Sequence, residues 1–181
     1  MNLIEVMVCG AILGLFMTIV CHALVVAYRT YTLTAKKSTD YRLATVAVDR
    51  LTRELRASDR VYSPDPAATP WSTFGTYTPE AGVNPPLIFR TYDATGERVL
   101  GYRWDKSART VQRLLYDPTF DPANTATHNV LETKKVTFEV DNFAIQRMDP
   151  ALTSGVPFLL VEMKLSSVLS PILTEVRVKS L

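Results

Sequence analysis

The chain has 181 residues, a formal net charge of +2, two cysteines and two histidines. That length suits one domain of ordinary size, or a smaller domain with an extension. The small net charge does not point to a nucleic-acid partner, and so few histidines and cysteines argue against a zinc centre or a Cys/His nucleophile.

The first predicted element is a helix that opens with a long apolar segment, residues 3–26, interrupted only by Glu5, Thr18 and His22. About 24 residues at about 1.5 Å each make roughly 36 Å of helix, enough to cross a bilayer core of about 30 Å. No Lys or Arg precedes Arg29 and no Ala-x-Ala motif follows the segment, unlike a cleaved secretory signal. We therefore expect the segment to be retained in the mature protein.

The same helix is predicted to continue as an amphipathic segment. Apolar residues recur at steps of four, three and four, which places them on one stripe of a helix: Ala44, Val48, Leu51 and Leu55. The opposite charges of Asp49/Arg53 and of Arg50/Glu54 lie at i,i+4 spacing, worth a few tenths of a kcal/mol each. Since the first proline is Pro64, one helix over residues 2–58 is permitted.

After the helix the pattern changes to loops and strands. Residues 59–86 hold six of the eleven prolines, and we expect a long surface loop there with room for a short strand. The runs 87–92, 100–104 and 111–116 are strand-like and are separated by turn-forming residues at 93–97 and 105–108. They predict an antiparallel meander.

The remaining residues predict further strands beyond a polar stretch at residues 117–129. Val136, Phe138 and Val140 alternate with polar residues, and another run covers residues 143–148. Two strands with one buried face follow, on either side of Pro171. A sheet with one apolar face and a striped helix can cover each other, so the expected fold class is α+β, a long helix packed on an antiparallel sheet.

Glu5 stands out because an acid inside a membrane helix is costly and usually functional. Two ordinary explanations compete with a functional one. Glu5 lies in the first turn, where it complements the helix dipole and can pair with the Met1 amine of its own chain. Alternatively, it lies at the level of the lipid headgroups, where its charge remains solvated.

The opening run MNLIEVMV, residues 1–8, resembles the N-terminus of mature type IV pilins and pseudopilins. Those sequences typically read Phe-Thr-Leu-Ile-Glu and continue with an unbroken apolar stretch. Leu3, Ile4 and Glu5 match that pattern, and Asn2 takes the place of Thr or Ser. The resemblance implies a pilin-like fold with residues 1–28 as a transmembrane or filament-core helix, 29–58 as its amphipathic continuation, and 59–181 as an extracytoplasmic domain.

The resemblance also implies an assembly mechanism. A prepilin peptidase would leave Met1 as the first residue, its amine would be methylated, and Glu5 would pair with the Met1 amine of a neighbouring subunit. An unpaired charge buried at the wrong height costs several kcal/mol, so this pairing would set the register. Helix-core packing would involve Leu3, Ile4, Val6, Leu13, Phe16, Ile19 and Val20.

The implied partners are further copies of the chain, other pilin-like subunits, the peptidase and the pilus assembly machinery. The implied location is the bacterial inner membrane before assembly, and an extracellular or periplasmic filament after it. Such filaments serve adhesion, motility, DNA uptake or protein secretion. No enzymatic activity and no cofactor are expected.

Three features depart from the family pattern. Many members carry proline where this chain has His22, and many close the C-terminal region with a disulfide that this chain cannot form. Basic residues follow the apolar segment and none precedes it, which opposes an external C-terminal domain unless a leader supplies cytoplasmic charge. The soluble half, with Tyr102, Trp104 and Arg113, resembles larger minor pilins and J-type minor pseudopilins.

Two further sites and several functions stay open. Asp117, Asp121 and Asn124 form a weak calcium candidate without EF-hand spacing, the alternative being an ordinary turn. Trp71, Phe74 and Tyr77 would form either an exposed aromatic patch or part of the core. The expected function is a structural filament subunit; the alternatives are a minor tip or initiating pilin, a type II secretion pseudopilin, and a monomeric membrane-anchored binding domain.

Overall fold

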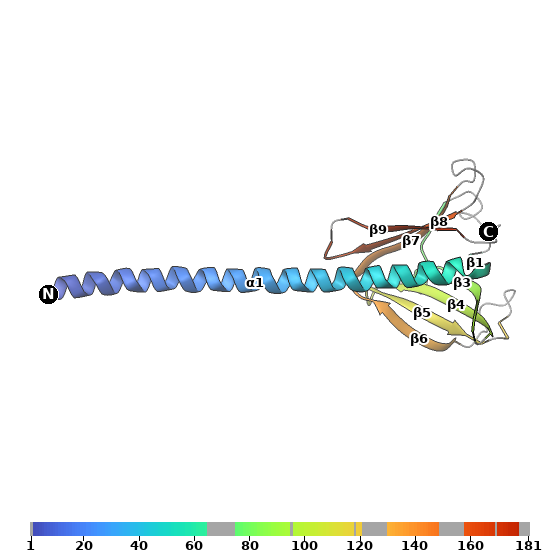
Figure 1. The fold of residues 1–181 in the computed structure, drawn as a ribbon, viewed down its shortest axis with the longest axis horizontal. Coiled ribbons are helices and arrows are strands. Elements are labelled where there is room, and N and C mark those ends of the chain that lie inside the picture. The colour runs from blue at the N-terminus through green and yellow to red at the C-terminus, as the bar shows by residue number, and fades with distance from the viewer. Residues whose placement is uncertain are drawn as a thin grey trace. The chain divides into compact units, whose positions relative to one another are not determined.

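The computed structural model describes residues 2–64, 75–94, 96–117, 119–120, 130–148, 158–168 and 170–177. The chain divides into two compact units, a first unit Met1–Thr39 and a second unit Asp40–Leu181. One helix, α1 (Leu3–Arg56), contributes residues to both units, and all strands belong to the second (Figure 1). The predicted helix over residues 2–58 is therefore confirmed to within two residues at each end.

The first unit is a single helical segment. Every described residue from 2 to 39 is exposed except Val20, which is half-buried. The helix runs without interruption through Gly14 and His22, and the Thr18 hydroxyl donates a hydrogen bond of 2.8 Å to the Gly14 carbonyl. This segment is long and apolar enough to cross a membrane.

The helical part of the second unit is amphipathic, as its spacing predicted. Its buried side is formed by Ala44, Ala47, Val48, Leu51, Thr52 and Leu55. The predicted i,i+4 ion pairs are both present, at 2.8 Å for Arg53 with Asp49 and 3.1 Å for Arg50 with Glu54. The apolar stripe is thus buried against the strands. The Asp49–Arg53 pair is exposed, whereas the Glu54 side chain of the other pair is 17 % exposed.

The described strands form two antiparallel sheets. The five-stranded sheet has the order β1-β3-β4-β5-β6 and the four-stranded sheet the order β2-β7-β8-β9 (Figure 1). The bounds are β1 (Ser58–Ser63), β2 (Thr76–Tyr77), β3 (Leu87–Asp93), β4 (Gly96–Asp105), β5 (Thr110–Tyr116), β6 (Val130–Thr137), β7 (Val140–Met148), β8 (Phe158–Leu165) and β9 (Ile172–Arg177). The sequence predicted a single antiparallel sheet, whereas the described strands form two.

The predicted meander is confirmed by β3, β4 and β5, which pair in sequence order. Gly96, with φ of 116°, occupies a backbone conformation in the β3–β4 turn that other residues rarely adopt. β2 is the short strand for which the predicted loop over residues 59–86 left room, but the loop prediction is wrong for residues 59–63, which form most of β1. β1 is an edge strand, where a proline such as Pro64 can follow directly without removing a ladder hydrogen bond.

The predicted alternation at residues 136–140 is also wrong, because it crosses the end of one strand and the start of another. Glu139 has a positive φ of 57°, and there the chain leaves β6 in one sheet and enters β7 in the other. Val140 is fully buried, whereas Phe138 is 49 % exposed. The change of sheet breaks the period of two, so Phe138 does not share the buried face.

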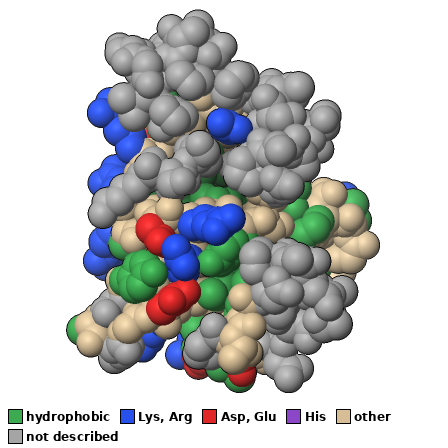
Figure 2. Space-filling view, turned by 90° about the vertical axis from the view of Figure 1, so that its right-hand side faces the viewer, with side chains coloured by type: hydrophobic (Ala, Val, Ile, Leu, Met, Phe, Trp, Pro, Cys, Tyr) green, Lys and Arg blue, Asp and Glu red, His purple; other side chains and the backbone are tan. Residues whose placement is uncertain are grey.

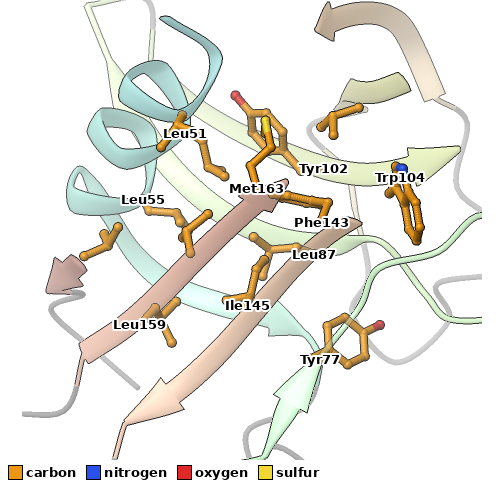
Figure 3. Packing of buried hydrophobic residues seen from close by; sticks show 14 of the residues in the cluster. Leu51, Leu55, Tyr77, Leu87, Tyr102, Trp104, Phe143, Ile145, Leu159 and Met163 are labelled. Carbon is orange, nitrogen blue, oxygen red and sulfur yellow. The ribbon is translucent and has the colours of Figure 1, made fainter. Parts of the chain in front are cut away.

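The main core lies between the helix and the two sheets (Figure 3). Leu51 and Leu55 of α1 pack with Leu87 and Tyr102 of the five-stranded sheet and with Ile145 of the four-stranded sheet. The Trp104 indole is buried as well, and its N–H donates a hydrogen bond of 3.2 Å to the Val140 carbonyl. Helix and sheets therefore share one apolar core.

A second core cluster covers the opposite face of the five-stranded sheet, where one-sided burial was expected. It consists of Ile88, Val99, Leu114, Tyr116 and Phe120, with Tyr62 packed against it. Gly101 lies under the Tyr116 ring, and a Cβ atom at this position would approach Tyr116 Cε2 to 2.7 Å. The five-stranded sheet therefore has buried apolar side chains on both faces. The Tyr116 ring can occupy its position because Gly101 has no side chain.

Candidate functional site

The N-terminus of α1 is built around Asn2 and Glu5. The Asn2 carbonyl accepts the first helical hydrogen bonds, from the Glu5 amide at 2.9 Å and the Val6 amide at 3.4 Å. In return, the backbone N–H of Asn2 donates a hydrogen bond of 3.0 Å to Glu5 Oε2. This return bond is the second half of a capping box, in which the acid of the first turn satisfies an otherwise unpaired backbone donor.

The surface that follows Glu5 is apolar and has no partner among the described residues of the chain. In the most apolar 18-residue window of the helix, no residue is buried. The predicted packing residues are accordingly exposed, except half-buried Val20: Leu3 76 %, Ile4 67 %, Val6 48 %, Leu13 63 %, Phe16 61 % and Ile19 59 %. An exposed apolar surface of this kind is typical of segments that contact lipid or other protein.

The other polar residues of this segment take no part in a site with Glu5. Cys9 and Cys21 are free thiols on the helix surface, and His22 is exposed one residue after Cys21. Helix geometry separates residues 9 and 21 by about 18 Å along the axis, too far for a disulfide within the chain. Glu5 remains the acid of the apolar segment, near its start.

Some predicted site residues lie outside the described part of the chain. These are Met1, the expected partner of Glu5, the calcium candidates Asp121 and Asn124, and the aromatic residues Trp71 and Phe74. Asp117 is described, and its Oδ1 accepts hydrogen bonds from the Thr119 amide at 2.9 Å and hydroxyl at 2.8 Å. That is the geometry of an ordinary Asx turn. Within the described residues, no group of three His, Cys, Asp or Glu side chains could hold a metal ion.

Tyr77 belongs to the core and not to an exposed aromatic patch. It is 7 % exposed and packs in the main core cluster, where Figure 3 shows its ring. Its hydroxyl donates a hydrogen bond to the Pro85 carbonyl, so the one polar atom of the side chain is satisfied.

The second unit contains a buried charge cluster that the sequence did not predict. Glu54 Oε2 accepts a hydrogen bond of 2.6 Å from the Tyr102 hydroxyl, and Arg113 Nε donates to Glu54 Oε1 and Oε2 at 3.0 and 3.2 Å. The Arg113 side chain is 9 % exposed and that of Glu54 17 %. Sequence spacing indicated only the Arg50 partner of Glu54, because Tyr102 and Arg113 meet it through the sheet.

The environment of this cluster shifts two pKa values. Burial, followed by the nearby negative charge of Glu54, raises the pKa of the Tyr102 hydroxyl well above its usual range. Burial works against the charge of Arg113, but its hydrogen bond and attraction to Glu54 raise its pKa overall. Arg113 therefore stays charged and Tyr102 stays neutral, which keeps Glu54 paired.

No protein-family model, curated protein or solved structure matched this chain.

Proposed function

We propose that the chain is a structural subunit of a type IV pilus-like filament, polymerising through the apolar part of α1. The observation that carries the proposal is the combination of one acid, Glu5, with a helical segment whose apolar window has no buried residue. Apolar side chains that the chain itself leaves uncovered are suited to lipid before assembly and to other copies of the helix afterwards.

Glu5 supplies the specificity that an apolar surface lacks. In the single chain, the Glu5 carboxylate accepts a hydrogen bond of 3.0 Å from the backbone N–H of Asn2. Because this donor is uncharged, the bond does not neutralise the carboxylate. Within a filament core, the Met1 amine of a neighbouring subunit would neutralise the charge. A subunit at another height would bury both charges unpaired, at a cost of several kcal/mol.

The steps of assembly follow from the resemblance of residues 1–8 to the N-terminus of type IV pilins. A prepilin peptidase exposes the Met1 amine, the amine is methylated, the subunit waits in the bacterial inner membrane, and the machinery adds it to a filament outside that membrane. The β-rich part of the chain then faces the extracellular space or the periplasm.

Glu5→Gln and Glu5→Ala test the role of the charge. Glutamine keeps an oxygen that can accept the Asn2 amide, so it preserves the capping box and removes only the charge. We expect both variants to lower the amount of the chain in sheared filaments by at least about tenfold, because a buried unpaired amine costs several kcal/mol. Glu132→Gln, an exposed change of the same kind on β6, is the matched control.

Normal incorporation of Glu5→Gln would overturn the charge pairing and leave Glu5 as a helix cap. Absence of the wild-type chain from filaments, with all of it in the membrane fraction, would favour the monomeric anchored domain. The abundance of the chain in the sheared fraction separates the remaining cases, since a shaft subunit is abundant there and a tip subunit or minor pseudopilin is scarce.

A further inference from the structure

Among the described strands, β6 and β9 each lie at the end of a sheet. β6 is the last strand of the five-stranded sheet, and β9 is the last strand of the four-stranded sheet. An edge strand has backbone N–H and C=O groups that no strand of its own sheet binds, so it can pair with a strand of another chain. Figure 1 shows β6 and β9 on opposite sides of the C-terminal part of α1. One copy therefore has two separate edges to which a further strand can add.

β6 and β9 are also the edges with room for a regular partner. β2 has only two residues, and the pairing of β1 with β3 shifts register at two places within six residues. β6 keeps a regular register with β5 from Glu132 to Lys135, and β9 keeps one with β8 over all six of its residues. Regular strands accept a further strand more readily than short or bulged ones.

The side chains of these two edges carry charges at matching spacing. On β6, Glu132 and Lys134 are two residues apart, share a face and are exposed. On β9, Glu175 and Arg177 are likewise two residues apart and exposed. An antiparallel pair that places Glu132 opposite Arg177 also places Lys134 opposite Glu175, and opposed charges of this kind stabilise strand pairing. A parallel pair of the same segments would place Glu132 opposite Glu175, so the charges favour the antiparallel arrangement.

The existing contacts of these side chains are weak enough to be exchanged. Lys134 and Glu132 contact each other at 2.7 Å along β6, but they are 58 % and 44 % exposed, and surface pairs of this kind contribute little. Within the described residues, neither Glu175 nor Arg177 takes part in an ion pair. The Glu175 carbonyl accepts a long hydrogen bond of 3.4 Å from the exposed Arg56 side chain, which a strand N–H can replace.

The surface of the second unit has no field of a single sign. Figure 2 shows one of its faces, where charged side chains of both signs lie beside hydrophobic ones. The net charge of the whole chain is only +2. Such a surface does not select a polyanion, whereas individual opposite charges can set the register between two strands.

We propose that β6 of one copy pairs antiparallel with β9 of a second copy, so that the five-stranded sheet of one continues into the four-stranded sheet of the next. Because the two edges differ, the contact is head to tail, and a joined pair keeps one β6 edge and one β9 edge for further copies. The contact can therefore repeat along a filament, and in this respect it rests on the proposed function. It joins the second units, whereas Glu5 and the apolar part of α1 join the first.

Disulfide trapping tests this register. Cys9→Ser and Cys21→Ser remove the native thiols, and Glu132→Cys with Arg177→Cys places one new thiol on each edge. Opposed residues of an antiparallel pair have Cα atoms about 4.5 to 5.5 Å apart, which suits a disulfide. Intact cells that make this variant are treated with copper phenanthroline and separated into membrane and sheared fractions. We expect a ladder of covalently linked copies, because each copy carries both thiols.

A second cysteine pair and a charge exchange serve as controls. Lys135→Cys with Arg177→Cys displaces one thiol by three residues, about 10 Å along the strand, and should give at least about tenfold fewer linked copies. Lys134→Glu, added to the first variant, brings a like charge opposite Glu175 and should lower the linked fraction about threefold. Further addition of Glu175→Lys should restore it. Lys134→Cys with Glu175→Cys, the other opposed pair, keeps the test valid if the first variant fails to fold.

The outcomes separate this contact from the filament itself. Absence of linked copies from every fraction overturns the contact, and so does equal linking of the displaced pair. A symmetric pair of two β6 or two β9 strands that matched their charges would set the new thiols two residues out of register, and it would give no ladder. Absence of the wild-type chain from the sheared fraction would count against the filament alone, since a ladder in the membrane fraction would still support the contact.

Discussion

The two parts of α1 differ in what surrounds them. Between Asp40 and Arg56 the helix buries a stripe of side chains, with Ala44 and Leu55 fully buried, whereas no described residue from 2 to 39 is buried. Helices in water gain most of their stability from packing an apolar face. The difference teaches that the second part is stabilised by packing within the chain, whereas the described residues of the chain do not cover the first part.

The largest expected loss of unfolding free energy comes from a leucine substitution in the second part of α1, and the same substitution in the first part serves as the comparison. Leu51→Ala, at a side chain 1 % exposed, should lower the free energy of unfolding by about 3 kcal/mol through a core cavity. Leu13→Ala, at a side chain 63 % exposed, should leave it unchanged. Denaturant unfolding of the full chain in nonionic detergent, followed by near-UV circular dichroism, measures both. Equal effects would abolish the distinction between the two parts.

The buried charge cluster should give the next largest effect. Arg113→Met leaves Glu54 without its closest cation in a site that is only 17 % exposed, and we expect a loss of about 2 kcal/mol in unfolding free energy. Arg53→Met removes an exposed partner of Asp49 and should cost less than about 0.5 kcal/mol. The same unfolding measurement decides, and a small effect at Arg113 would mean that solvent replaces the lost guanidinium.

Two glycine substitutions compare the second unit, which contains Gly101, with the apolar part of α1, which contains Gly14. Gly101→Ala should destabilise the second unit by about 1 to 2 kcal/mol, because the new Cβ would lie 2.7 Å from Tyr116 Cε2. Gly14→Ala has nothing within 4 Å of the new atom and should leave the unfolding free energy of the second unit unchanged. Tyr116→Leu should recover part of the loss when combined with Gly101→Ala. Failure of that rescue would place the strain elsewhere.

The smallest effect concerns pH. The bidentate hydrogen bond from Arg90, at 3.0 and 2.6 Å, lowers the pKa of Asp59. A lowered carboxyl pKa adds stability above the ordinary value near 4, and the gain is lost as pH falls through the folded-state pKa. Asp59 is 36 % exposed, so Asp59→Asn should cost less than about 1 kcal/mol at pH 6, and the cost should be smaller at pH 2.5. Unfolding curves at the two pH values test this, and an equal loss at both would assign the effect to packing.

Local patterns predicted the parts of the fold that depend on local order. The spacing of Ala44, Val48, Leu51 and Leu55 fixes one helix face, and short turns between apolar runs fix the meander of β3, β4 and β5. The change of sheet was not predictable in this way, because Phe138 and Val140 continue the alternation although Glu139 turns the chain. The place where the chain changes sheets depends on the backbone conformation of Glu139.

The candidate sites divide along the same line. Glu5 was recognisable because its position in an apolar helix is a property of the sequence itself, and its capping bond to Asn2 is local. The cluster of Glu54 with Tyr102 and Arg113 depends on which helix face meets the sheet. No spacing rule connects residues so far apart in the chain.

The strand order has a consequence for a chain that emerges from its N-terminus. All strands of the five-stranded sheet precede residue 138, so this sheet can pair while later residues are still being synthesised. β2 lies between β1 and β3 in the chain but pairs with β7, joining Tyr77 to Ile145. It must wait for β7, which makes the smaller sheet the later one to be completed and the closing of the core around Tyr77 a late event.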